Sequence, residues 1–179
     1  MKRKIFAFGA AILVFAIVSF GTLAYFSVTD RVENMITAGS VDLVLHQTDA
    51  DGNLVDGAIE VMPGDSTVDI MTIENTGDHP LWVRVLLTKQ VNGTELSADC
   101  MSLDINTTEW TYSEGYYYYN TALSAGETTV PLFTEVRIDG ESVGVEYIGK
   151  TFTFGIDVYG VQSENNGATV WDAIGWSHD

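Results

Sequence analysis

Apolar and polar residues alternate along most of the chain after residue 40, which is the pattern of β-strands with one buried face. Four stretches alternate most clearly, at 41–46, 81–87, 132–139 and 151–158. Clusters of Gly, Asp, Asn and Ser separate these stretches, and no helical period with capping residues interrupts them. Strands with one apolar face bury it by stacking two sheets. The sequence therefore predicts an all-β fold, an antiparallel β-sandwich of jelly-roll type.

The first 24 residues have the layout of a secretory signal peptide. A basic stretch at 2–4 precedes an apolar run at 5–18 and the small residues at 21–24. This order predicts cleavage between Ala24 and Tyr25. The alternative is an uncleaved membrane anchor, because residues 5–26 are uncharged and mostly apolar and about 20 such residues span a bilayer.

The segment that follows the predicted cleavage site also alternates, and a glycine separates it from the sandwich. Five of its apolar residues share one parity, interrupted by Asp30 and Asn34. Gly39 precedes a switch to the other parity at Val41, as expected of a hinge between two strands. The residues of that parity are Phe26, Val28, Val32, Ile36 and Ala38. Pattern alone leaves two interpretations open, a separable strand and an ordinary first strand of the same domain.

These boundaries divide the chain into four parts. We predict a signal peptide at 1–24, an N-terminal strand segment at 25–39, a sandwich domain at 40–162 and a C-terminal extension at 163–179. The extension contains Trp171 and Trp176 without a clear period, and its expected place is the edge of the sandwich.

Charge and cysteine content restrict the function. Without residues 1–24 the chain has five basic and 25 acidic residues, a net charge of about −20. Such a surface repels nucleic acid, so a nucleic-acid partner is excluded, and it favours solubility. Cys100 is the only cysteine, so no disulfide forms within the chain, which for an exported protein favours a bacterial cell surface or matrix.

An acidic loop and three histidines are the candidates for metal binding. Oxygen-bearing side chains follow the spacing of a calcium loop at Asp49, Asp51, Asn53 and Glu60, but Leu54 occupies the position where such a loop needs glycine. An acidic hairpin connection explains the same residues. The histidines are far apart in sequence and none forms a zinc-protease motif; they are His46, His79 and His178. We expect no catalytic residues, no resident metal and no enzyme activity.

Four consecutive tyrosines follow a predicted turn at 113–115. In a hairpin, Tyr116 and Tyr118 face one side of the sheet and Tyr117 and Tyr119 the other. One pair is then expected in the core, and Tyr116 and Tyr118 are a possible surface contact for sugars or another subunit.

Several motifs in order resemble the TasA and camelysin family of Gram-positive bacteria, whose members are exported through the signal peptidase SipW. The likeness extends along most of the chain, with matching stretches at 21–27, 34–43, 62–65, 74–77, 82–85, 115–120, 123–129, 132–133 and 158–162. The last of them has Gly160 where the family more often has alanine.

The resemblance implies a secreted subunit of a cell-surface or biofilm-matrix fibre. Such subunits polymerise head to tail by donor-strand exchange, here with the segment 25–39 as the donor and a SipW-type peptidase as its releasing enzyme. Other matrix proteins or polysaccharide are further expected partners. Two alternatives remain, a carbohydrate-binding surface module and a camelysin-like metalloprotease.

Overall fold

The structure is a computed structural model of the chain. It describes residues 26–31, 41–55, 58–61, 63–92 and 94–176, with only the backbone described for 26–31 and 58–61. Within these ranges the chain forms eleven strands and one short 3-10 helix, η1 (Val145–Tyr147). The strands in chain order are β1 (Phe26–Arg31), β2 (Leu43–Thr48), β3 (Ala58–Val61), β4 (Ser66–Val68), β5 (Ile70–Asn75), β6 (Leu81–Val91), β7 (Met101–Leu103), β8 (Trp110–Ser113), β9 (Tyr116–Tyr119), β10 (Glu135–Ile138) and β11 (Thr151–Gln162).

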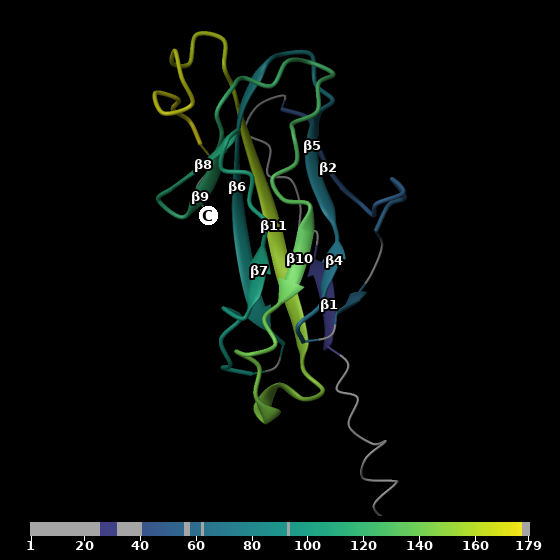
Figure 1. The fold of residues 1–179 in the computed structure, drawn as a ribbon. Coiled ribbons are helices and arrows are strands. Elements are labelled where there is room, and N and C mark those ends of the chain that lie inside the picture. Colours follow the sequence, from purple (N-terminus) through teal and green to yellow (C-terminus); the bar gives the residue numbers. More distant parts are fainter. Residues whose placement is uncertain (1–25, 32–40, 56–57, 62, 93, 177–179) are drawn as a thin grey trace, which may run out of the picture.

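One layer of the fold is a six-stranded sheet in the order β3-β1-β11-β6-β9-β8. Its centre is the antiparallel pair β6 and β11, whose register runs from Phe152 opposite Val91 to Gln162 opposite Leu81. These two long strands lie side by side along the molecule in Figure 1. The end of the sandwich where β11 begins is therefore the end where β6 finishes.

The second layer combines two small sheets, β4-β10-β7 and β2-β5. The segment 126–134 joins them, because its backbone is hydrogen-bonded along β5. Met71 donates to the Phe133 carbonyl at 3.1 Å, and Thr129 donates to the Ile73 carbonyl at 2.8 Å. Backbone groups that the strand ladders leave unpaired are thus satisfied across the layer.

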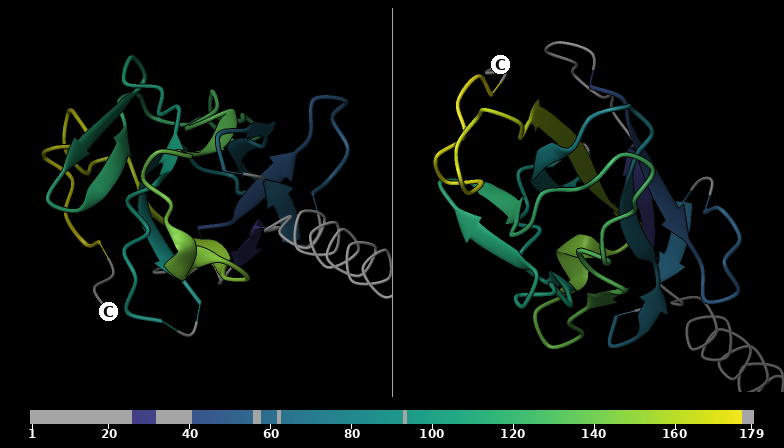
Figure 2. Two further views of the ribbon diagram at one scale, coloured as in Figure 1. Left: turned by 60° about the horizontal axis from the view of Figure 1, so that its bottom comes forward. Right: turned by 90° about the horizontal axis from the view of Figure 1, so that it is seen from above.

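The main core lies between the two layers. Phe152, Phe154 and Ile156 from β11 belong to the same buried cluster as Met71 and Val136 from the second layer. The rings of Phe133 and Phe154 meet edge to face across it, with centroids 5.7 Å apart. Seen from above in the right-hand view of Figure 2, the strands enclose the interior of the domain, which this cluster fills.

The predicted all-β fold is confirmed. The described residues contain no α-helix, and none of them lies in a helix long and apolar enough to cross a membrane. Every described strand pair is antiparallel apart from β1 with β11, which is parallel. Parallel neighbours need a long connection, and here nearly the whole sandwich forms it.

Candidate functional site

The N-terminal strand β1 lies inside the six-stranded sheet. It pairs in parallel with the first half of β11, from Ser27 opposite Thr151 to Arg31 opposite Gly155. On its other side it pairs antiparallel with β3, from Phe26 opposite Val61 to Thr29 opposite Ala58. We call this place between β11 and β3 the strand slot.

The strand slot borders the main core on the β11 side. Val28 and Asp30 of β1 are in register with Phe152 and Phe154, whose rings are fully buried. Within the described residues β3 has no strand partner other than β1. Withdrawal of β1 would leave β3 without its ladder and give β11 an open edge over five of its twelve residues.

Only part of the predicted N-terminal segment falls in the described residues. Phe26 and Val28 lie in β1, where the backbone alone is described. The other predicted residues of this segment lie outside the described ranges; they are Ala24, Tyr25, Val32, Ile36, Ala38 and Gly39. The structure thus shows β1 paired within its own chain, and exchange between chains stays a prediction.

The tyrosine hairpin forms as predicted. β8 and β9 pair from Ser113 opposite Tyr116 to Trp110 opposite Tyr119. Glu114 and Gly115 both have positive φ, 50° and 91°, as a two-residue turn of a tight hairpin requires. On the inner face the rings of Tyr119 and Trp110 lie 4.9 Å apart between centroids.

The outer face of the hairpin surrounds a buried arginine. Arg84 of β6 is only 4% exposed. The chain has a net charge of −17, yet this cation is buried instead of lying among the acidic groups of the surface. Its guanidinium carbon lies 3.9 Å from the Tyr116 ring centroid, 5.3 Å from that of Tyr159 and 4.7 Å from that of Trp176. Its Nη1 donates a hydrogen bond of 3.4 Å to the Tyr118 hydroxyl. Ring faces favour a cation, and they are more favourable where water is absent.

The C-terminal extension completes this aromatic site from outside. We call residues 163–176 the C-terminal strap; it lies beside the β8–β9 hairpin in Figures 1 and 2. The Trp82 indole donates to the Asn166 carbonyl at 3.0 Å. The side chain of Asn166 then closes the strap on itself, donating to the carbonyls of Gln162 and Ile174 and accepting from the Ile174 amide.

Apolar contacts of the strap cover Tyr118. Val170 is buried against the strand residues Trp82 and Val161, and the Trp171 ring lies 4.9 Å from that of Tyr118. Tyr118 is consequently only 8% exposed, whereas Tyr116 is half-buried. The predicted surface contact at Tyr116 and Tyr118 needs this correction, because the strap already occupies the outer face of Tyr118.

The acidic loop is closed by its own hydrogen bonds. The Asp49 carboxylate accepts from the backbone amides of Asp51 and Asn53, both at 2.9 Å, and from the Asn53 side chain at 3.0 Å. These bonds lower the pKa of Asp49, with the Asn53 side chain contributing most. Glu60 lies in β3, where the backbone alone is described. A calcium ion in this loop would have to replace these hydrogen bonds.

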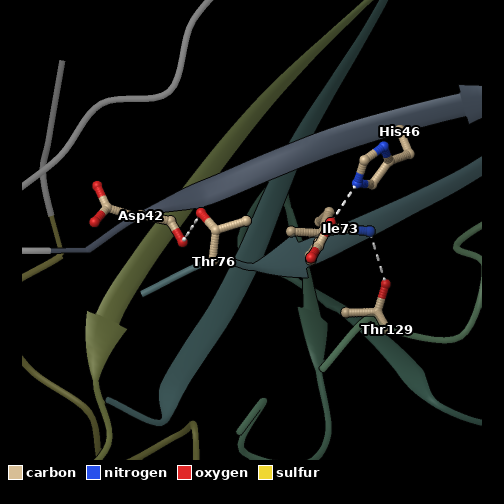
Figure 3. A network of polar contacts seen from close by, with 6 residues as sticks. Asp42, His46, Ile73, Thr76 and Thr129 are labelled. Carbon is tan, nitrogen blue, oxygen red and sulfur yellow. Dashed lines mark hydrogen bonds and ion pairs between the residues drawn. The ribbon is translucent and has the colours of Figure 1, made fainter. Parts of the chain in front are cut away.

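The two described histidines are each at least partly exposed and pair with different acidic residues. His46 of β2 contacts Glu74 of β5 at 2.8 Å, beside the bond from the Ile73 amide to the Thr129 hydroxyl (Figure 3). His79 lies 3.7 Å from Glu164 of the strap, and His178 lies outside the described ranges. In the described part of the chain no three His, Cys, Asp or Glu residues come together as metal ligands. A catalytic zinc needs three protein ligands, so the described residues do not fit one.

Cys100 is a packing residue of the main core. It is buried in the same cluster as Met101 and Val136. Burial raises the pKa of its thiol, and a thiol kept protonated is a poor nucleophile.

The fold and the slot define an all-β protein whose N-terminal strand is held in a sheet by residues more than a hundred positions away. Residues 1–107, more than half of the chain, match the family described as camelysin metallo-endopeptidase. The chain belongs to this family, which confirms the resemblance drawn from its motifs. No curated protein and no solved structure matches the chain.

Proposed function

We propose that this protein is a secreted structural subunit that polymerises into cell-surface or biofilm-matrix fibres by exchange of its N-terminal strand. The observation that carries the proposal is the position of β1 between β11 and β3. In this arrangement β1 of one subunit leaves its own slot and enters the slot of the next. We also propose that the two-layer architecture is a sandwich of jelly-roll type.

Backbone pairing makes such an exchange nearly neutral in energy. A strand in a sheet satisfies its N–H and C=O groups in the same way whichever chain supplies them. The donor segment and the acceptor slot are different surfaces of the subunit, so the contact is head-to-tail and need not close into a ring. A filament follows from repeated exchange.

Export supplies the trigger in this proposal. Until a SipW-type peptidase cuts between Ala24 and Tyr25, the apolar run keeps the strand segment at the membrane. Cleavage frees the segment 25–39, and Gly39 serves as its hinge. The finished fibre is extracellular on a Gram-positive cell, with other matrix proteins or polysaccharide as possible companions.

Cross-linking inside the slot tests the exchange. In a Cys100→Ala background, Ser27→Cys and Thr151→Cys place two thiols at registered positions of β1 and β11. Fibres joined by oxidation or a short bis-maleimide should give a ladder of oligomers on a non-reducing gel. Cross-linked fibres that yield single chains would show that β1 remains paired with β11 of its own subunit.

A matched pair in the body of the sandwich controls this experiment. Ser102 and Arg137 are registered neighbours in β7 and β10, and both are exposed. The pair Ser102→Cys and Arg137→Cys should give single linked chains from the same fibres. A ladder from this pair would mean that random collisions between subunits cause the cross-links.

A metalloprotease is the second candidate, since the family description carries that name. The donor set of the described residues argues against it, as no third ligand accompanies His46 or His79. Casein cleavage by the pure protein, abolished by a chelator, would establish the protease in place of our expectation of no enzyme activity. A carbohydrate-binding module is the third candidate, and loss of glycan binding on Tyr116→Ala would support it.

A further inference from the structure

The end of the sandwich where β11 begins carries two exposed aliphatic side chains on a fixed turn. Val145 is 81% exposed and Ile148 is 50% exposed, at either end of η1. Between them Tyr147 is buried: its ring stacks on Phe152 with centroids 5.8 Å apart, and its hydroxyl donates to the Ser97 carbonyl at 3.1 Å. The core therefore holds the turn in place while both aliphatic side chains face out.

This turn lies at the same end of the molecule as the start of β1. Ser27 is in register with Thr151, the first residue of β11, and the two strands are parallel. The turn η1 comes just before Thr151 in the chain, so it extends beyond the point where β1 begins. In Figure 1 the short yellow-green helix η1 lies at the lower end of the sandwich, the end from which strand β1 starts.

The sequence leaves almost no spacer between this end and the membrane segment. About 20 residues are needed to cross the hydrocarbon, so the span takes the whole uncharged stretch 5–24. Tyr25 alone then separates it from Phe26, the first residue of β1. One extended residue covers at most about 3.6 Å. The polar layer on each side of the hydrocarbon is roughly 5–8 Å thick. With the run in the membrane, a tip that reaches past the start of β1 meets the headgroups.

We propose that the tip formed by Val145 and Ile148 contacts the outer surface of the membrane while the precursor is tethered by residues 5–24. The proposal rests on the proposed function only in taking these residues as the membrane segment. The partner is the lipid interface, where exposed aliphatic side chains are favourable and nearby polar groups stay wet.

Charge around the tip sets how strong the contact is. Glu141 and Glu146 are exposed on the same loop, and carboxylates are repelled by anionic headgroups. Two aliphatic side chains bury far less area than an acyl chain, which by itself gives marginal binding. The contact therefore depends on the tether, which keeps the local concentration of the tip at the surface high. Cleavage ends it, and the mature subunit leaves the membrane.

A fluorescent probe at the tip tests this contact in the full chain. In a Cys100→Ala background, Val145→Cys is labelled with the environment-sensitive dye NBD, and the uncleaved chain is placed in lipid nanodiscs of phosphatidylcholine and phosphatidylglycerol. The matched control is Asp78→Cys, exposed and three residues before Leu81, which pairs with Gln162 at the opposite end. Spin-labelled lipids then quench whichever probe lies at the headgroups.

The expected result is a blue shift and loss of most of the fluorescence at position 145, with neither at position 78. A chain that starts at Tyr25, mixed with empty nanodiscs, should show no quenching at either position. An unquenched probe at 145, equal quenching at both positions, or quenching without the tether would each overturn the proposal. Fibre formation by the mature chain is scored separately, so a failed tip contact with normal fibres leaves the exchange intact.

Discussion

Strand β1 and the C-terminal strap are both attached to the six-stranded sheet, but they are held in different ways. β1 enters the strand slot through backbone ladders on both sides, to β11 and to β3. The C-terminal strap forms no strand and lies on the outer face, where Trp171 and Trp176 pack on Tyr118. A backbone ladder accepts any chain in extended conformation, whereas interlocking side chains specify one occupant. The difference suggests that β1 is the exchangeable element and the strap the permanent one.

Deletion of residues 25–36 from the mature chain is the strongest way to break this comparison. It removes β1, so the slot has no donor to receive, and we expect complete loss of fibres by electron microscopy. The matched control is truncation after Gln162, which removes the strap and leaves the slot whole. Fibres that persist without residues 25–36, or vanish only without the strap, would reverse the assigned roles.

The strap truncation should also lower the stability of the subunit. It exposes Trp82, Tyr118 and Val161, which the strap now covers, and it leaves Arg84 without the Trp176 ring. Loss of large buried side chains costs about 3–5 kcal/mol, and we expect a decrease in the free energy of unfolding of that order. Urea unfolding measured by tryptophan fluorescence and by far-UV circular dichroism checks it. An unchanged midpoint would mean that the strap is an appendage without a structural role.

The alternation of apolar residues predicts the strands of four stretches, and the turn residues at 113–115 predict the tyrosine hairpin. Four stretches showed this alternation, and the structure has strands in each of them, because a half-buried sheet imposes a period of two. The same pattern marked β1 as a strand but could not name its partners. Parity tells which face a residue takes, and it contains no information on the parallel neighbour β11.

The aromatic site around Arg84 could not be predicted from local pattern. In the stretch 81–87 Arg84 occupies a position of the outer face, where a charged residue normally meets water. The rings around it come from distant parts of the chain, and one of them, Trp176, is more than 90 positions further along. The strap has no period because irregular backbone and Asn166 hydrogen bonds shape it. Two tryptophans in an acidic tail were the one available signal.

Single substitutions in the strap test the same comparison with a smaller expected loss of stability. Trp176→Ala removes the ring above Arg84 and its contact with Tyr118, and we expect a destabilisation of about 1–3 kcal/mol. Ile174→Ala is the control within the same segment, since Ile174 is 76% exposed and should change stability by less than about 0.5 kcal/mol. Equal effects of the two substitutions would contradict specific anchoring by Trp176.

In the second layer a side chain and a backbone are joined directly, because the Asp104 carboxylate accepts hydrogen bonds from residues 134 and 135 at the start of β10. Asp104 Oδ1 accepts from the amides of Thr134 and Glu135, both at 2.7 Å, and Oδ2 accepts from the Thr134 hydroxyl at 2.5 Å. Desolvation raises the pKa of Asp104, but these three hydrogen bonds outweigh it and leave the pKa lowered. The start of β10 is thus held by a carboxylate that loses its charge when acid protonates it.

The sign of its pH dependence follows from the lowered pKa. The ionised carboxylate is favoured in the folded state, so its contribution is full above the unfolded pKa and disappears as the pH falls through the folded one. We expect Asp104→Asn to lower the unfolding midpoint near neutral pH and to match the parent chain in strong acid. Asp104 is exposed, so the difference should be small, and thermal melts across the acid range measure it. A difference in unfolding midpoint that stays constant at every pH would show that packing, and not the charge of Asp104, stabilises this contact, as packing does in the C-terminal strap.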